Sequence, residues 1–284
     1  MSVGARPERP ILEVSFSVSG FEIVARGMDE LHLQKICTAI CSDQGEVFDG
    51  KPKVILLETV CQSAVGEGKY IRQIGGSGNY GHVRLRLEPS PEGTGFAFAN
   101  ELPESTLPSE YAVAAERGVR EAAFSGVLFG YEVTDVKATL IDSSHHEMDS
   151  NAMAFQIAGS LAFKEAAKKA GPVMLEPIMA VKFMADLASV QETVAELNAR
   201  RGRIENMESH AGWLEIAALV PLLEMLNSSK YGRPDYPMEF ARYEQTRRPS
   251  DKFGEDGIGV TANLPKLPHT GRRSATVQPD IAFD

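Results

Sequence analysis

Residues 139–171, TLIDSSHHEMDSNAMAFQIAGSLAFKEAAKKAG, contain a strand, a polar loop and a helix in direct succession. The pattern predicts a strand that ends at Ile141 and a helix whose N-cap is Ser150 or Asn151, because a short side-chain oxygen can accept a hydrogen bond from the first turn. Gly171, which is followed by proline, is a typical helix stop. Functional side chains are expected in the loop that these two rigid elements hold.

The loop and the helix differ in chemistry. Leu161 repeats with Met153 and Ile157 at helical spacing, and together with Phe155 and Ala158 they predict one apolar face. Lysines collect near the C-terminal end of the helix, where the helix dipole favours cations. The polar side chains of the loop are Asp142, Ser143, Ser144, His145, His146, Glu147 and Asp149.

Composition narrows the class of protein. The 284 residues are 43% hydrophobic and carry a net charge of −10, so any RNA contact must come from a local patch or a loop tip. Cys37, Cys41 and Cys61 form neither a CxxC motif nor a disulfide framework, which fits a reducing cytosol. The sequence has no signal-peptide pattern and no apolar run of membrane length, so we expect a soluble, cytoplasmic protein without membrane contact.

Hydrophobic periodicity divides the chain into an α+β succession of units. It predicts a flexible N-terminus at residues 1–10, two strands and a helix at 11–53, a strand-rich unit with two helices at 54–172, a third unit at 173–245 and a disordered tail at 246–284. The third unit has the order βαββαβ, which is that of a ferredoxin-like plait. The unit at 11–53 is too small to hold a core alone and is expected to be a piece of something larger.

Glycines punctuate the unit at 54–172. A strand from residue 54 is expected to end at residues 66–68, and a glycine-rich loop is expected at residues 75–81 before a strand of alternating apolar residues and arginines. A helix is expected to open at Ser109.

Six stretches along residues 11–245 carry a family resemblance: GMDELHL, GKPKVILLETV, GGSGNYGHV, HEMDSNAMAFQIAGSLAFKEAAKKAGPVMLEPIM, ELNARRGRI, and PLLEM with PMEFARY. The chain resembles the C-terminal part of bacterial elongation factor G in these stretches and in the order in which they occur. The resemblance implies that residues 11–53 correspond to the second half of domain III, a partial ferredoxin-like unit. It implies a ribosomal-protein-S5-domain-2-like βαβ fold for residues 54–172, as domain IV, and a ferredoxin-like plait for residues 173–245, as domain V.

The resemblance also implies a function. In that family the tip of domain IV enters the decoding centre of the small ribosomal subunit and helps to move transfer RNA in translocation. The family's tip histidine falls on His146, and residues 75–81 are similar to the adjacent tip loop. An imidazole can stack on and hydrogen bond to unstacked bases, and glycine lets a backbone approach RNA closely. The expected residues that contact ribosomal or transfer RNA are Ser144, His145, His146, Glu147, Asp149, Gly75, Gly76, Ser77, Gly78, Asn79 and Tyr80.

The departures from the family matter as much as the matches. The chain has no GxxxxGK[ST] motif, so we expect no GTPase activity of its own, no catalytic residue, no nucleotide site and no cofactor. The expected partners are the ribosome and, through an open edge of the half domain at 11–53, a separate GTPase-bearing chain. Residues 226–236 are shorter than the family's segment, which puts any ribosome contact there in question.

Other interpretations stay open at this point. His146 could be a loop histidine without a partner, and residues 75–81 a plain hairpin connection. The chain could also be a degenerate or accessory interaction module that keeps the fold and has lost ribosome binding. A metal-dependent hydrolase is disfavoured because its candidate ligands lack a helical HxxxH pair and a cysteine set. Those ligands are His82, His145, His146, Glu147 and Asp149.

Overall fold

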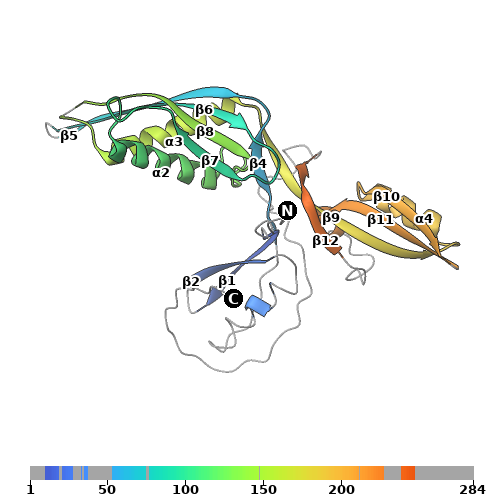
Figure 1. The fold of residues 1–284 in the computed structure, drawn as a ribbon. Coiled ribbons are helices and arrows are strands. Elements are labelled where there is room, and N and C mark those ends of the chain that lie inside the picture. Colours follow the sequence, from blue (N-terminus) through green and yellow to red (C-terminus); the bar gives the residue numbers. More distant parts are fainter. Residues whose placement is uncertain are drawn as a thin grey trace, which may run out of the picture. The chain divides into compact units, whose positions relative to one another are not determined.

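A computed structural model gives the fold of the chain (Figure 1). It describes residues 10–18, 21–27, 33, 35–37, 53–74, 77–146, 148–210, 212–226 and 238–246. The chain forms two compact units, one built mainly on residues 56–176 and another that contains residues 177–241, and each is described by itself. The helix expected at residues 28–41 lies largely outside the described residues, as do the segment 227–237 and the predicted disordered tail from residue 247 onward.

A four-stranded sheet with two helices on one face forms the unit at 56–176 (Figure 1). Its strand order is β5-β6-β8-β7; β5, β6 and β8 pair antiparallel, and β7 pairs parallel to β8. Helix α2 links the two parallel strands, and α3 follows β8. The elements are β5 (Ala64–Ile74), β6 (Ser77–Pro89), β7 (Phe96–Asn100), α2 (Ser109–Ser125), β8 (Val136–Ser144) and α3 (Ala152–Lys169).

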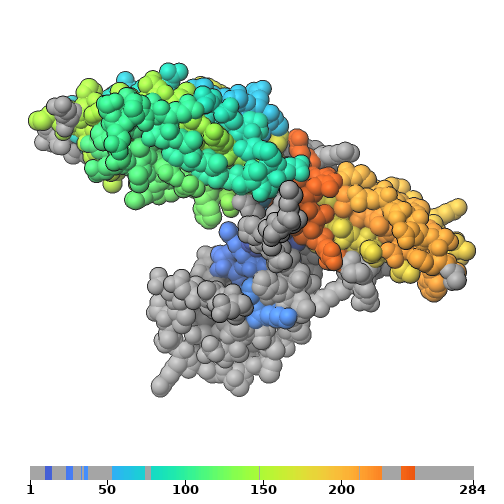
Figure 2. Space-filling model, in the orientation of Figure 1, coloured from blue at the N-terminus to red at the C-terminus, as the bar shows by residue number. Residues whose placement is uncertain are grey.

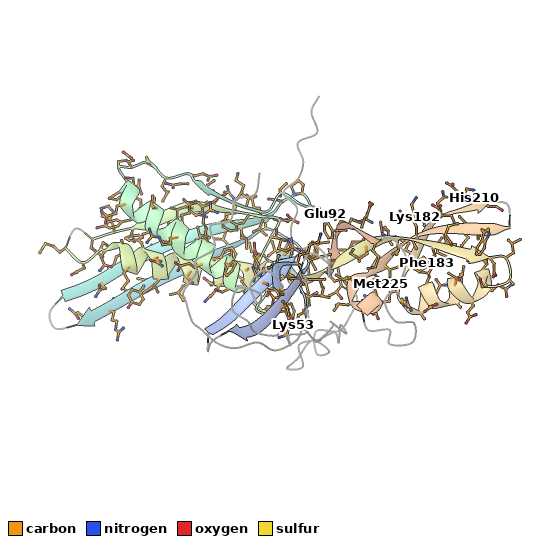
Figure 3. All side chains as sticks on the ribbon, turned by 90° about the horizontal axis from the view of Figure 1, so that it is seen from below. Lys53, Glu92, Lys182, Phe183, His210 and Met225 are labelled. Carbon is orange, nitrogen blue, oxygen red and sulfur yellow. The ribbon has the colours of Figure 1, made fainter. Side chains whose placement is uncertain are left out.

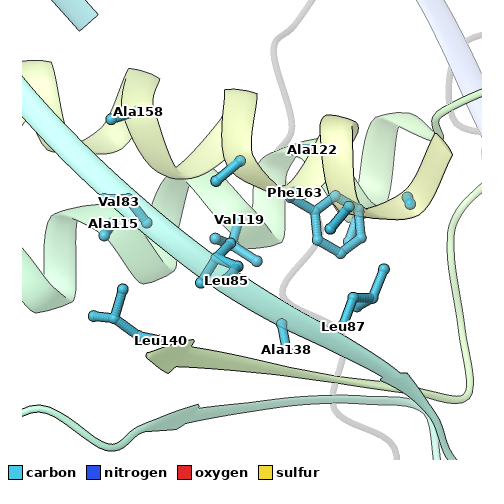
Figure 4. Close-up of a cluster of buried hydrophobic side chains, with 14 of the residues drawn as sticks. Val83, Leu85, Leu87, Ala115, Val119, Ala122, Ala138, Leu140, Ala158 and Phe163 are labelled. Atoms are coloured by element: carbon cyan, nitrogen blue, oxygen red, sulfur yellow. The ribbon is translucent and has the colours of Figure 1, made fainter. Parts of the chain in front are cut away.

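The core of this unit lies between the sheet and the two helices (Figure 4). Alternate residues of β6, namely Val83, Leu85 and Leu87, are fully buried beneath the helices. Their burial follows from the period of two along a strand, and each such side chain contributes about 1.5–3 kcal/mol. Figure 2 shows the same unit, coloured cyan to yellow-green, as a surface that is longer along the strands than across them.

The strand end predicted at residues 66–68 is wrong, because β5 runs straight through both glycines to Ile74. A Cβ added to Gly68 would lie 1.9 Å from the carbonyl oxygen of Ala158, and one added to Gly66 would lie 2.2 Å from that of Ala162. The glycines are therefore there to let α3 lie directly on the strand, a use that Gly has in strand interiors as well as in turns.

The face predicted for α3 is right for Phe155 and Ala158, which are fully buried, and wrong for the other three residues. Met153 is 68% exposed and Leu161 44% exposed, and Ile157 is only half-buried. The side of the helix that packs against α2 and β5 consists of Ala154, Phe155, Ala158, Gly159, Ala162, Phe163, Ala166 and Ala167. Small residues allow this close approach, so the long aliphatic side chains point to solvent. The predicted cap is confirmed as Asn151, whose side-chain oxygen accepts a hydrogen bond of 2.9 Å from the amide of Ala154.

Strand boundaries also differ from the expectation. The strand predicted to end at Ile141 continues to Ser144, so the first three residues of the predicted polar loop belong to β8. The strand expected from residue 54 onward is three elements, β3 (Lys53–Val54), β4 (Leu57–Val60) and β5. β4 pairs with the first residues of β9 (Pro172–Asp186), and β3 pairs with β1 (Leu12–Val18).

A buried carboxylate anchors the connection between α2 and β8. Glu58 of β4 is fully buried, and its two carboxylate oxygens accept hydrogen bonds from four backbone amides. We call the donating segment, residues 127–131, the amide cradle. The donors are Val127 at 3.1 Å, Leu128 at 3.1 Å, Phe129 at 2.9 Å and Tyr131 at 3.1 Å.

The N-terminal strands form a small separate sheet in which β1 (Leu12–Val18) pairs with β2 (Phe21–Gly27) and β3. β1 and β2 confirm the two strands predicted in this part of the chain. Whether residues 11–53 form a partial ferredoxin-like unit stays a prediction, because most of the expected helix is not described.

Residues 173–245, the third unit in the sequence-based division, have the topology of a ferredoxin-like plait, as predicted. The sheet order is β10-β11-β9-β12, so the first and third strands of the motif lie at its centre. Neighbouring residues of β9 face opposite sides, as Lys182 and Phe183 show in Figure 3. The elements are β9 (Pro172–Asp186), α4 (Val190–Ala199), β10 (Arg203–His210), β11 (Trp213–Pro221), α5 (Leu222–Leu226) and β12 (Met238–Gln245). No helix in the described part of the chain is long and apolar enough to cross a membrane.

Candidate functional site

The loop between β8 and α3 lies against the first residues of β6. The amide of Tyr80 donates to the carbonyl of Asp149 at 2.7 Å, and Tyr80 and Ser150 form an isolated parallel bridge. The side-chain amide of Asn151 donates to the side-chain oxygen of Asn79. The two predicted tip loops therefore meet at the same end of the β5–β6 hairpin, which we call the tip: residues 77–80 and 144–151.

Ser150 uses every polar group that it has in hydrogen bonds, and its hydroxyl ties this loop to β6. Its hydroxyl accepts from the amide of His146 at 2.9 Å and donates to the carbonyl of Tyr80 at 3.0 Å. Its amide donates to the carbonyl of His146 at 3.1 Å, and its carbonyl accepts from the hydroxyl of Tyr111 at 3.1 Å. The backbone at His146 is thus held by hydrogen bonds at both its N–H and its C=O.

Each histidine of the loop has a tyrosine beside it. The rings of His146 and Tyr80 meet edge to face, with centroids 4.3 Å apart and planes at 70°. The ring of His145 lies 6.1 Å from that of Tyr111, which stacks at 4.7 Å on the buried ring of Phe155. His146 is exposed, whereas His145 is half-buried, so His146 is the histidine that the tip presents to solvent.

Two glycines of the predicted glycine-rich loop make this approach possible. A Cβ on Gly78 would lie 2.5 Å from the carboxylate of Asp149, and one on Gly81 would lie 2.6 Å from the carbonyl of Ala154. These glycines serve packing within the protein, in addition to any contact that the loop makes outside it.

A chain of hydrogen bonds leads from the tip along the sheet. The hydroxyl of Tyr80 is bonded to that of Ser144 at 2.8 Å, and Ser144 is bonded to Nδ1 of His82 at 3.0 Å. Nε2 of His82 is bonded to the carboxylate of Glu67 at 2.9 Å. The rotation of Tyr80 is therefore restricted at its hydroxyl as well as at its ring.

Glu165 of α3 lies next to this series of hydrogen bonds, at the edge of the sheet. Its carboxylate accepts from the Lys169 ammonium at 2.7 Å and from the amide of Glu67 at 2.6 Å. The ammonium and then the amide stabilise the charged form, and they lower the pKa of Glu165. The same contacts cover part of the outer edge of β5, because the ammonium also donates to the carbonyl of Val65.

The structure brings most of the predicted RNA-contacting residues together. Ser144, His146 and Asp149 are exposed, and His145, Gly78, Asn79 and Tyr80 are half-buried. Ser77 pairs with Ile74 across the hairpin. Gly75, Gly76 and Glu147 lie outside the described residues.

The alternative metal set gains no geometric support from the described part of the tip. Both ring nitrogens of His82 are engaged by Ser144 and Glu67. Among the residues that the structure describes, no three or more histidine, cysteine, aspartate or glutamate side chains are grouped so as to hold a metal ion.

Sequence reasoning missed the residues that hold the tip in place. Sequence patterns indicate Ser150 only as a helix cap and His82 only as a metal ligand, and they give Tyr111 no role at the tip. A signal was present for His82 alone, because it alternates with buried Val83 and Leu85 and so had to face the open side of the sheet.

Comparison with known proteins assigns both units. Residues 52–171 match the family described as elongation factor G, domain IV, and residues 173–250 match elongation factor G C-terminus. The elongation factor G of Aquifex pyrophilus is 41% identical over 252 residues, which cover 86% of this chain and 36% of that protein. A crystal structure of a Thermus thermophilus protein is similar with a TM-score of 0.61 and 37% identity, over 83% of this chain and 36% of that one. The chain thus spans 36% of the length of each of these relatives.

Proposed function

This chain belongs to the elongation factor G family, and we propose that its tip binds ribosomal or transfer RNA as part of translocation-type movement on the ribosome. The observation that carries the proposal is the exposed His146 imidazole. It lies on a loop that is hydrogen bonded to β6 through Ser150 and that ends in Asn151, the N-cap of α3. A contact residue on such a support keeps its geometry when it meets a partner.

The chemistry of the tip suits unpaired nucleotides. An imidazole offers a ring face for stacking and two nitrogens for hydrogen bonds to base edges. The neighbouring Asn79 and Ser144 add short polar side chains. Because the whole chain carries a net charge of −10, shape and local contacts must supply affinity that a basic surface would otherwise give.

The proposal gives the chain a mechanical role. Neither of the two matched domains is a GTPase domain, so movement driven by GTP would need a GTPase supplied by another polypeptide segment or chain. In this proposal the unit at 56–176 acts as a stiff body that presents His146 to the RNA, and the site of action is the cytoplasm.

Cosedimentation of the full chain with ribosomes tests this proposal. We expect His146→Ala to weaken binding roughly five- to hundredfold, the range of a lost base stack of about 1–3 kcal/mol. His210→Ala is the matched control, because His210 is an exposed histidine at the end of β10 in the other unit (Figure 3). Chemical probing of ribosomal RNA should show protection that is lost in the first variant and kept in the second.

Equal binding of the two variants would refute a role for the tip. Absence of any ribosome binding, with or without a supplied GTPase fragment, would favour the alternative of an interaction module that keeps the fold alone.

A further inference from the structure

We propose that Tyr80 is a positioning residue that orients the His146 imidazole, with Ser150 as the anchor of the loop that carries it. This inference rests on the proposed function, since it concerns how the same tip presents its histidine. It differs from the sequence-based expectation, in which Tyr80 itself contacts RNA.

The first step is the fixed position of the loop backbone. Ser150 Oγ joins the amide of His146 to the carbonyl of Tyr80, with distances of 2.9 and 3.0 Å. One hydroxyl thus connects two segments that lie 70 residues apart in the sequence. The Cα of His146 therefore cannot move away from β6 unless one of these bonds breaks.

The second step is the direction of the imidazole. With its backbone fixed, His146 can still rotate about its side-chain torsions, and the ring of Tyr80 occupies one side of it at 4.3 Å. The interplanar angle of 70° is an edge-to-face arrangement, which aromatic rings favour over a face-to-face sandwich. Tyr80 therefore favours rotamers of His146 that keep this contact.

The third step is the rigidity of Tyr80 itself. Its amide donates to Asp149, its carbonyl accepts from Ser150, and its hydroxyl is bonded to Ser144, which is bonded in turn to His82. Because both its backbone and its hydroxyl are hydrogen bonded, the ring of Tyr80 has little freedom to move. Its hydroxyl is already engaged within the protein. Tyr80 is therefore better suited to orient His146 than to hydrogen bond to a base.

A second tyrosine accounts for the different exposure of the two histidines. Tyr111 of α2 lies beside His145, stacks on Phe155 and donates to the carbonyl of Ser150. His145 is thereby kept half-buried at the start of the loop, and of the two histidines only His146 is exposed.

Two substitutions of Tyr80 separate orientation from contact. Tyr80→Phe keeps the ring and removes the hydroxyl, whereas Tyr80→Leu removes the ring. In NMR spectra of the full chain, the carbon-bound ring protons of His146 should keep their chemical shifts in the phenylalanine variant. They should move in the leucine variant, because the ring current of Tyr80 is lost, and the Hα–Hβ couplings of His146 should change there as well, because its ring is no longer held in one rotamer. Ribosome binding should weaken less in the phenylalanine variant than in the leucine variant, where the loss of an aromatic pair of about 0.5–1.5 kcal/mol weakens it about two- to tenfold.

Substitutions of Ser150 test the anchor. Ser150→Ala should speed amide hydrogen exchange at His146 and weaken ribosome binding, and Ser150→Thr, which retains a hydroxyl, should restore both. Ser160→Ala is the matched control, since Ser160 is a half-buried serine of α3 away from the tip contacts. Circular dichroism of each variant establishes that the fold is intact.

The outcomes distinguish this inference from the proposed function. If His146→Ala weakens binding but Tyr80→Leu changes neither the His146 couplings nor the affinity, positioning is refuted and the role of the tip stands. If both Tyr80 variants weaken binding equally while the His146 couplings stay constant, Tyr80 contacts RNA through its hydroxyl, and positioning is again refuted. If His146→Ala binds like the parent, the proposed function fails, and the His146 couplings alone decide whether Tyr80 orients the ring.

Discussion

Replacing Glu58 by glutamine should destabilise the unit at 56–176 by about 2–6 kcal/mol, because two of the amides that bond to this buried carboxylate are left without an acceptor. Each carboxylate oxygen of Glu58 accepts from two amides of the cradle. An amide side chain has nearly the same shape, yet one of its ends is a donor, and this end must face two N–H groups in either orientation. Each orphaned donor costs about 1–3 kcal/mol, which gives the range stated.

The size of this effect decides the choice of variant. A domain is stable by about 5–15 kcal/mol, so the glutamine variant should still fold. Glu58→Ala would remove acceptors from all four amides and also open a cavity, and it should not yield a folded unit.

Amide hydrogen exchange measures the effect where it arises. In the glutamine variant, exchange at Val127, Leu128, Phe129 and Tyr131 should accelerate, by about thirtyfold for the lower bound of 2 kcal/mol. Thermal unfolding of the full chain should begin at a lower temperature. The matched control is Glu92→Gln, because Glu92 is an exposed glutamate in the turn after β6 (Figure 3). Exchange at the cradle equal to that of the parent would show that the four hydrogen bonds do not hold this connection.

Three further predictions concern α3 and the strand beneath it. Gly68→Ala should destabilise the unit by at least about 1–3 kcal/mol in chemical denaturation, because the new methyl group forces α3 away from β5. Phe163→Ala should cost about 3–5 kcal/mol, whereas Leu161→Gln should cost under about 0.5 kcal/mol, since the first side chain is fully buried and the second is 44% exposed; equal losses would restore the face that the sequence predicts. Lys169 and a backbone amide lower the pKa of Glu165, so its stabilising contribution is complete above its ordinary pKa of 4.5 and is lost as the pH falls through the lower folded value. Glu165→Gln should therefore flatten the pH dependence of the melting temperature below about pH 4.5, and an unchanged acid limb would contradict this.

Sequence patterns predict elements well where local signals and tertiary contacts agree. The plait at 173–245 follows from strands and helices whose alternation and stops are local, and the structure has the same order. The cap at Asn151 is likewise local, since it needs only a side chain within reach of the next turn.

The errors arise where the role of a residue depends on contact with a segment that is distant in the sequence. Gly66 and Gly68 look like a turn because a turn is the commoner reason for closely spaced glycines. Their actual reason is α3, which begins only at Ala152, beyond three further strands and a helix. The same contact explains why Met153 and Leu161 are misplaced, because a helix that lies directly on glycines places alanines against them and turns these longer aliphatic residues outward.

The tip shows the same limit in its functional residues. The sequence can indicate His146 because a polar loop between two elements is locally visible and because it resembles a family motif. It cannot indicate that Ser150 and Tyr80 hold this histidine. The hydrogen bond between them joins the start of β6 to the end of the loop after β8, and β7 and α2 lie between these segments in the sequence. A loop histidine free to rotate would lose side-chain entropy on meeting RNA, and a histidine already oriented by a neighbouring ring loses less of it. The affinity of the tip should therefore depend on Tyr80 and Ser150 as well as on the histidine, and a substitution of His146 alone would assign all of their contributions to that residue.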